Sequence, residues 1–232
     1  DKDGDNAGQL YANKGTYISY DKISKNIQNA VISTEDRTFW TNPGFSIKGY
    51  ARAALGYLIH HGISGGGSNL TQKLAKISLL TQKQHLSRKG EELFLSIEIN
   101  HIYTKKEILT MYLNNAYFGN GVWGVQDASE KYFGKDASEL NPAEGAVLAG
   151  ILKAPNNYNP IDSMSNSLAR RNLVLDLMAE NKKLTASQAS YYKSTSIDVN
   201  DNYEVSSSYK YPYFFDAVIS EAVTKYGLKE DD

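Results

Sequence analysis

The sequence lacks several features, and each absence excludes a class of protein or site. Cysteine is absent, so disulfide bonds and thiolate metal sites are excluded. No apolar run reaches the roughly 18 residues that a membrane-spanning helix needs. The net charge is only −1, which argues against a general polyanion or nucleic-acid binder. The four histidines, at positions 60, 61, 85 and 101, have no metal-ligand spacing.

What is present predicts a folded, mainly α-helical protein. The 232 residues are 41% hydrophobic and 11% aromatic, enough for one large domain or two small ones. Apolar residues recur at helical spacing along most of the chain, and few segments alternate as strands do. A loose arm is expected over 1–22, a loop over 154–160 and a linker from about 194. We expect helices over 23–39, 45–60, 71–80, 88–103, 108–114, 127–133, 142–152, 167–181, 185–192 and 213–226.

Three glycines at positions 65–67 run directly into one of these helices. Backbone without side chains, followed by a helix N-terminus, favours binding of anionic oxygen. Gln72 and Lys76 are four residues apart and share one helix face, which Lys73 borders. Taken alone, the glycine run also fits a flexible loop, and it lacks the spacing of a nucleotide-binding P-loop.

Two further segments add charged side chains. Glu35 lies near the end of the helix expected over 23–39, before a turn, and is either a solvated surface carboxylate or a general base beside apolar neighbours. Arg88 and Glu92 are four apart on the next helix, either as solvated charges or pointing into one cleft. Residues 73–107 carry seven Lys/Arg and four Glu, and such a locally basic region is suited to a pyrophosphate.

Five segments of the chain, at 35–44, 66–76, 88–92, 108–114 and 144–160, follow one another in a fixed order. They resemble the motifs of glycosyltransferase family 51, the peptidoglycan polymerase domain of class A penicillin-binding proteins. The resemblance covers about residues 5–180. The chain departs from the family at Asn42, where His is usual. It departs again at Asn69, Leu70 and Lys73, which replace Thr, Ile and Gln.

The resemblance implies a fold and a domain organisation. It implies a lysozyme-like helical lobe with a smaller membrane-proximal lobe. The glycosyltransferase domain is expected over 1–193, including the arm. Residues 194–232 are expected to form a linker and the start of a junction towards a transpeptidase domain, because 211–215 resembles that junction. Two Ser-x-x-Lys matches, at 190 and 207, are interpreted as chance, since no Lys-Thr-Gly follows them.

The resemblance also implies a reaction and roles for individual residues. Lipid II would be polymerised into β-1,4-linked glycan strands with release of undecaprenyl pyrophosphate. Glu35 would be the general base, and Glu92 would orient cations or help to hold Mg²⁺ or Mn²⁺ on the pyrophosphate, with no organic cofactor. Cations at 76, 88 and 89 would stabilise the leaving pyrophosphate. The expected substrate-binding residues are Asp36, Ser68, Gln72, Lys73, Lys76, Arg88, Lys89 and Asn114.

Partners and location follow from the same resemblance. We expect lipid II, the nascent glycan strand and a transpeptidase domain as partners, inhibition by moenomycin, and no nucleic acid. The stripe over 45–60 is either an ordinary core helix or a segment that touches the membrane surface. The expected place is the outer face of the bacterial cytoplasmic membrane, with an anchor upstream. Alternatives are a lytic transglycosylase or muramidase-like hydrolase, and a non-catalytic lipid II-binding module.

Overall fold

The computed structural model describes residues 15–45, 68–78 and 87–200, without the side chains of residues 78 and 87–89. These parts of the chain are helical and contain no strand, only an isolated bridge between Tyr117 and Trp123. The prediction of a mainly α fold is therefore confirmed for them. Among the described helices, none combines the length and the apolar character needed to span a bilayer. The expected helices over 45–60 and 213–226, and with the first of them the smaller lobe, lie outside the described residues.

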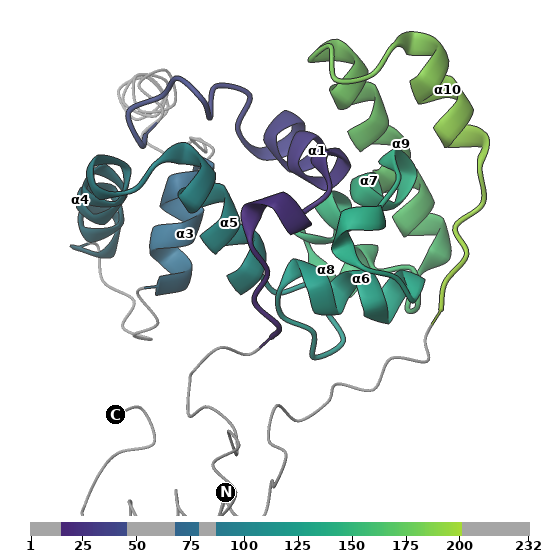
Figure 1. Ribbon diagram of the computed structural model, residues 1–232, viewed down its shortest axis with the longest axis horizontal. Helices are drawn as coiled ribbons and strands as arrows, with labels where there is room; N and C mark the ends of the chain where they lie inside the picture. Colours follow the sequence, from purple (N-terminus) through teal and green to yellow (C-terminus); the bar gives the residue numbers. More distant parts are fainter. Residues whose placement is uncertain (1–14, 46–67, 79–86, 201–232) are drawn as a thin grey trace, which may run out of the picture.

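From α4 onwards the described helices follow one another closely along the chain (Figure 1). Two of the described helices, η1 and η2, are single 3-10 turns. The elements are η1 (Tyr20–Lys22), α1 (Lys25–Glu35), α3 (Leu70–Ser78), α4 (Ser87–Ile102), α5 (Lys105–Asn115), α6 (Val125–Phe133), η2 (Ala137–Glu139), α7 (Pro142–Ile151), α8 (Pro155–Tyr158), α9 (Met164–Glu180) and α10 (Ala186–Ser194).

Local capping chemistry sets many of the helix ends where the sequence predicts them. Asn141 and Thr185 each form a reciprocal capping box with the residue three positions on, Glu144 and Gln188. Gly134 ends α6 in the left-handed conformation, with φ of 64°. These caps satisfy backbone groups that a helix end would otherwise leave unpaired.

Helix α7 forms the centre of the larger group of helices. It is almost entirely buried and packs against both α1 and α9, and α10 packs against α9 and α7 (Figure 1). A Cβ at Gly145 would lie 2.9 Å from the backbone nitrogen of Ile27, so only glycine lets α7 approach α1 this closely. Helix α1 is thereby fixed on the core, and its C-terminal residue, Glu35, is fixed with it.

Helices α3, α4 and α5 form a second group beside α1. Helix α3 packs against α4 and α5, and its residues Leu70, Leu74 and Ala75 belong to the same apolar core as Ile27 and Val31 of α1. In Figure 1, α3 and α4 lie on one side and α7, α9 and α10 on the other, with α1 and α5 between them. The end of α1 therefore faces the start of α3.

The described part of the N-terminal arm lies along α5. The Asn114 side chain accepts a hydrogen bond from the Ile18 amide at 2.8 Å and donates one to the Ile18 carbonyl at 2.9 Å. The Thr16 amide donates to the carboxylate of Asp127 at 3.2 Å. The arm is thus held by side chains that imitate a strand partner.

Three segments differ from the sequence-based expectation. Helix α1 ends at Glu35 instead of at residue 39, because the Asp36 side chain accepts from the Thr38 amide and favours a turn there. Residues 155–158 form the single helical turn α8 inside the expected loop, with Pro155 at its first position, where its fixed φ favours a helix. The first residues of the expected linker are bonded to the helical lobe. The buried Arg171 donates to the carbonyls of Lys193 and Thr195, both at 2.7 Å. The Asn200 amide donates to the Tyr132 carbonyl at 3.0 Å. The chain is therefore held on the helical lobe up to residue 200, whereas the domain boundary at 193 stays a prediction.

Candidate active site

Glu35 is the last residue of α1, and its carboxylate is held from α3. The Lys73 ammonium donates a hydrogen bond to Oε2 of Glu35 and forms an ion pair with it. The Glu35 side chain is only 10% exposed. Its other oxygen, Oε1, is buried and accepts no hydrogen bond from any described residue. A carboxylate that is mostly shielded from water, with one oxygen paired and the other without a described donor, is a suitable general base.

Tyr112 of α5 lies within electrostatic reach of this carboxylate. Burial raises the pKa of the Tyr112 hydroxyl, and the negative charge of Glu35 raises it further. The phenol therefore stays protonated throughout the physiological range. No role for Tyr112 is expected from the sequence, although this residue lies within the fourth motif segment.

Asp36, the next residue after Glu35, joins three segments. Its Oδ1 accepts hydrogen bonds from the amide and hydroxyl of Thr38, at 3.2 and 3.1 Å. Its Oδ2 accepts one from the Leu70 amide at the start of α3, at 3.4 Å. Asp36 is 8% exposed. These contacts give it a structural role in docking α3 onto the end of α1, and its expected contact with substrate stays a prediction.

Asn42, at the position where the family usually has His, completes the environment of Asp36. Its Nδ2 donates to both Asp36 oxygens, at 3.1 and 2.8 Å. Its Oδ1 accepts from the Gly44 amide at 3.1 Å and from Lys105 Nζ at 3.0 Å. Burial lowers the pKa of Lys105, and the charge of Asp36 opposes that shift. Lys105 also lies over the ring of Phe39, 5.1 Å from its centroid. The Asn therefore links an acid and a base that do not contact each other directly.

Asn69 and Gln72 form a reciprocal cap at the start of α3. Asn69 Oδ1 accepts from the Gln72 amide at 2.8 Å, and Gln72 Oε1 accepts from the Asn69 amide at 3.1 Å. Both side chains are buried. Asn is among the best N-cap residues, so the departure at position 69 preserves the helix start. Gln72 thus has a structural contact here, and its expected role towards substrate stays a prediction.

Ser68, just before α3, contacts Glu92 of α4. The Ser68 hydroxyl lies 3.4 Å from Oε1 of Glu92, a buried residue of α4. Lys76, one turn after Lys73, is exposed and forms no ion pair with a described residue. Arg88 lies in the first turn of α4, next to Lys89, but both side chains lie outside the described part.

The structure thus brings most of the expected site residues together around the start of α3. Glu35, Asp36, Ser68 and Lys73 lie on segments that contact one another there. Asn114 differs, because all its hydrogen bonds go to backbone, including one to the Thr110 carbonyl at 2.8 Å. It holds the arm in place, and its contact with substrate stays a prediction.

Metal binding depends on the carboxylates of this region. No group of three or more His, Asp or Glu able to hold a metal ion occurs in 15–45, 68–78 or 87–200. Glu92 accepts a hydrogen bond from the Ser68 hydroxyl. A divalent ion held through Glu92 and the oxygens of a substrate pyrophosphate stays a prediction.

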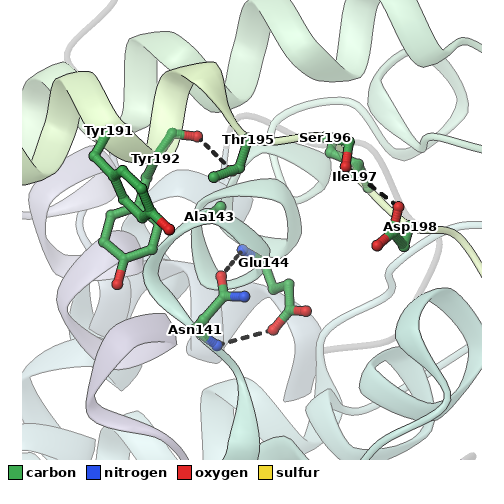
Figure 2. A pocket seen from close by; sticks show the side chains of 9 residues that line it. All are labelled: Asn141, Ala143, Glu144, Tyr191, Tyr192, Thr195, Ser196, Ile197 and Asp198. Atoms are coloured by element: carbon green, nitrogen blue, oxygen red, sulfur yellow. Dashed lines mark hydrogen bonds between the residues drawn. The ribbon is translucent and has the colours of Figure 1, made fainter.

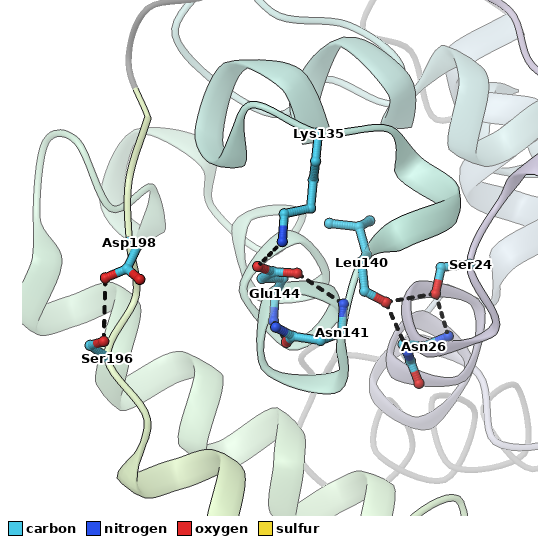
Figure 3. Close-up of polar contacts among 8 residues, drawn as sticks. All are labelled: Ser24, Asn26, Lys135, Leu140, Asn141, Glu144, Ser196 and Asp198. Carbon is cyan, nitrogen blue, oxygen red and sulfur yellow. Dashed lines mark hydrogen bonds and ion pairs between the residues drawn. The ribbon is translucent and has the colours of Figure 1, made fainter.

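A separate pocket of about 240 Å³ lies between the start of α7 and the segment that follows α10 (Figure 2). In Figure 3, the Glu144 carboxylate accepts from the Asn141 amide at 2.9 Å and from Lys135 at 2.8 Å, which commits both of its oxygens. None of the expected site residues lines this pocket. Its lining residues are Asn141, Ala143, Glu144, Tyr191, Tyr192, Thr195, Ser196, Ile197 and Asp198.

Comparison with known proteins assigns the class to which this fold and site belong. Residues 3–179 match the family model described as Transglycosylase, so the chain belongs to the transglycosylase family. Penicillin-binding protein 2a of Streptococcus pneumoniae is 48% identical over 237 residues, covering 100% of this chain and 32% of that protein. Penicillin-binding protein 1A of Aquifex aeolicus is 39% identical over 229 residues, covering 96% of this chain and 31% of the relative.

A solved structure of penicillin-binding protein 1A from Haemophilus influenzae aligns with 68% of this chain and 20% of its own. The alignment has a TM-score of 0.39 and 26% identity. The chain spans about a third of the length of the curated relatives named above. The match to the family model and the two curated relatives confirm the family resemblance read from the five motif segments.

Proposed function

We propose that the chain is a peptidoglycan glycosyltransferase that polymerises lipid II into β-1,4-linked glycan strands. The observation that carries this proposal is the Glu35 carboxylate at the end of α1, in a chain of the transglycosylase family: its side chain is 10% exposed, and its Oε1 accepts no hydrogen bond from a described residue. Glu35 faces the start of α3, which directly follows the glycine run. Base and anion site would thus border one cleft.

In this reaction the 4-hydroxyl oxygen of the acceptor sugar attacks C1 of the donor. Its proton passes to Oε1 of Glu35 as the new C1–O bond forms. The bond from C1 to the pyrophosphate oxygen breaks, and its electron pair leaves with undecaprenyl pyrophosphate. Base and leaving group lie on opposite faces of the donor sugar, so the configuration at C1 inverts.

The leaving pyrophosphate needs charge stabilisation more than a proton. Fixed cations provide this because they act on charge that grows in the transition state. Lys76 is exposed on α3 and is free to meet an anion, and Arg88 and Lys89 begin α4 beside it in the second helix group. Glu92 would orient these cations, contribute a ligand to Mg²⁺ or Mn²⁺ on the pyrophosphate, or do both. Such an ion would add positive charge to the leaving group.

The setting of the full-length protein belongs to the same proposal. The chain would act at the outer face of the bacterial cytoplasmic membrane, touch the lipid surface through 45–60, and precede a transpeptidase domain. Its relatives support the last point, because each is about three times as long as the matched region and is named a penicillin-binding protein. Lipid II and the growing strand would be its substrates.

The test is a polymerisation assay with labelled lipid II in detergent, with and without moenomycin. We expect labelled glycan strands that separate from monomeric lipid II. Moenomycin should abolish their formation. A parallel incubation with finished glycan strands tests the hydrolase alternative. Release of small muropeptides from those strands, without polymer from lipid II, would overturn the proposal. Lipid II binding without either product would favour a non-catalytic module.

A further inference from the structure

The three departures in the glycine-loop motif share one location, the surface where α3 docks on the end of α1. Asn69 caps α3 through the Gln72 amide at 2.8 Å. Leu70 is fully buried, and its amide donates to Asp36 at 3.4 Å. Lys73, one turn further on, pairs with Glu35. The residues that distinguish this chain therefore fix α3 relative to the expected base.

Of the ion pairs that join two side chains described by the structure, the pair of Lys73 and Glu35 has the least exposed acid. The Glu35 side chain is 10% exposed, compared with 17% for Glu144, 51% for Asp176 and 60% for Glu180. A carboxylate so far removed from water needs a partner, and removing that partner is costly. Lys73 supplies the partner from the neighbouring helix.

The contact between Lys73 and Glu35 also makes the two carboxylate oxygens of Glu35 different from each other. Lys73 Nζ occupies Oε2, and no described residue donates to Oε1. Rotation of the carboxylate about its last side-chain bond would break the Lys73 contact. Lys73 therefore holds one oxygen in place and leaves the other available to accept a proton.

We propose that Lys73 is a positioning residue for the base, which fixes the Glu35 carboxylate so that Oε1 meets the acceptor hydroxyl. The proposal rests on the proposed glycosyltransferase function. It assigns Lys73 to Glu35 rather than to the pyrophosphate, a role that Lys76 on the same helix is free to fill. Lys73 keeps its bond to Oε2 while the 4-hydroxyl proton transfers to Oε1.

The first experiment measures polymerisation kinetics of Lys73→Met, which keeps the length of the side chain and removes its donor. We expect kcat to fall by about 10- to 100-fold, because a base displaced by about 1 Å loses rate on that scale. The KM for lipid II is expected to stay unchanged. Lys73→Arg should recover most of kcat. Lys193→Met is the matched control, since it removes the lysine of the ion pair with Asp176 and should leave both constants unchanged.

A rise in KM with an unchanged kcat for Lys73→Met would overturn the proposal and assign Lys73 to substrate binding. An unchanged kcat and KM would also overturn it. Both outcomes leave the proposed function intact as long as the wild-type chain polymerises lipid II.

A second measurement does not depend on activity. The shifts in Tm of Glu35→Gln, Lys73→Met and the double variant form a thermodynamic cycle. We expect the double variant to lose clearly less than the sum of the two single losses. Additive shifts would overturn the pairing even if no polymerisation were seen, so failure of the pair and failure of the function are distinguishable.

Discussion

The Asn42 amide donates hydrogen bonds to both carboxylate oxygens of Asp36, at 3.1 Å to Oδ1 and 2.8 Å to Oδ2. Asn42 also accepts from Lys105 Nζ at 3.0 Å, which lies 63 residues further along the chain. The departure from the family's His is thus integrated into a network that joins the turn after α1 to the start of α5. Asp36 in turn holds the first amide of α3.

Asn42→Ala should destabilise the fold by about 1–3 kcal/mol, because it leaves the buried Asp36 carboxylate without its main side-chain donor. Chemical denaturation gives the unfolding free energy. Asn42→Asp is the matched variant, since it keeps the shape and the acceptor for Lys105 but places a second carboxylate against Asp36. It should also destabilise. Wild-type stability in both variants would contradict the structural role of Asn42.

Asn69→Ala should lower the unfolding free energy by about 0.5–2 kcal/mol, the usual cost of an N-cap. The reason is the loss of the 2.8 Å bond from the Gln72 amide. Asn69→Thr, which restores the family's residue, should lose less, because Thr also caps helices. Denaturation curves of the two variants at one pH make the comparison. Equal losses in both would contradict the capping role.

Asn114→Leu should release the N-terminal arm from α5, because the side chain provides both hydrogen bonds to Ile18. Hydrogen exchange followed by mass spectrometry or NMR is the measurement. The Ile18 amide should exchange at least about 5-fold faster, as expected for the loss of a hydrogen bond that contributes about 1 kcal/mol. Amides in α9 should be unaffected and serve as the internal control. Unchanged protection at Ile18 would assign another anchor to the arm.

Tyr112 makes stability fall at alkaline pH. Its pKa is raised in the folded protein above the usual 10.0, first by burial and then by Glu35. Above pH 10 the unfolded chain loses the phenolic proton while the folded chain keeps it. Stability from this group is therefore complete below about pH 10 and is lost as pH rises, by at most about 1.4 kcal/mol per pH unit.

Tyr112→Phe should make the decline above pH 10 shallower than in the wild type, measured by denaturation at several alkaline pH values. Tyr17→Phe, at a tyrosine that is 57% exposed, is the matched control and should leave the slope unchanged. An unchanged slope in Tyr112→Phe would mean that its hydroxyl titrates alike in both states.

The sequence predicted those parts of the fold that depend on local chemistry. The helix expected over 127–133 ends where predicted, at the Gly134 cap, and the helix expected from 142 begins where predicted, after the Asn141 cap. The single turn α8 was missed because four residues carry no helical period. The hydrogen bonds that hold the chain on the helical lobe as far as Asn200 were missed, because their partners, Arg171 and Tyr132, are distant in sequence.

The expected site shows the same division. The order of the motifs was enough to expect Glu35 and the glycine-loop helix in one site. In the structure Lys73 of α3 forms an ion pair with Glu35. The roles of Lys105 and Tyr112 depend on contacts across 63 and 77 residues, and no spacing rule predicts such pairs. A charged residue at the start of α5 and a tyrosine on its apolar side were the available signals.

The most direct test of the central claim is lipid II polymerisation by Glu35→Gln, which keeps the shape of the base but removes its ability to accept the proton. The account predicts a fall in kcat of about 10²- to 10⁴-fold with the fold and lipid II binding retained. Circular dichroism and binding of labelled lipid II provide those two controls. Polymerisation at the wild-type rate by a folded Glu35→Gln variant would contradict the assignment of Glu35 as the base.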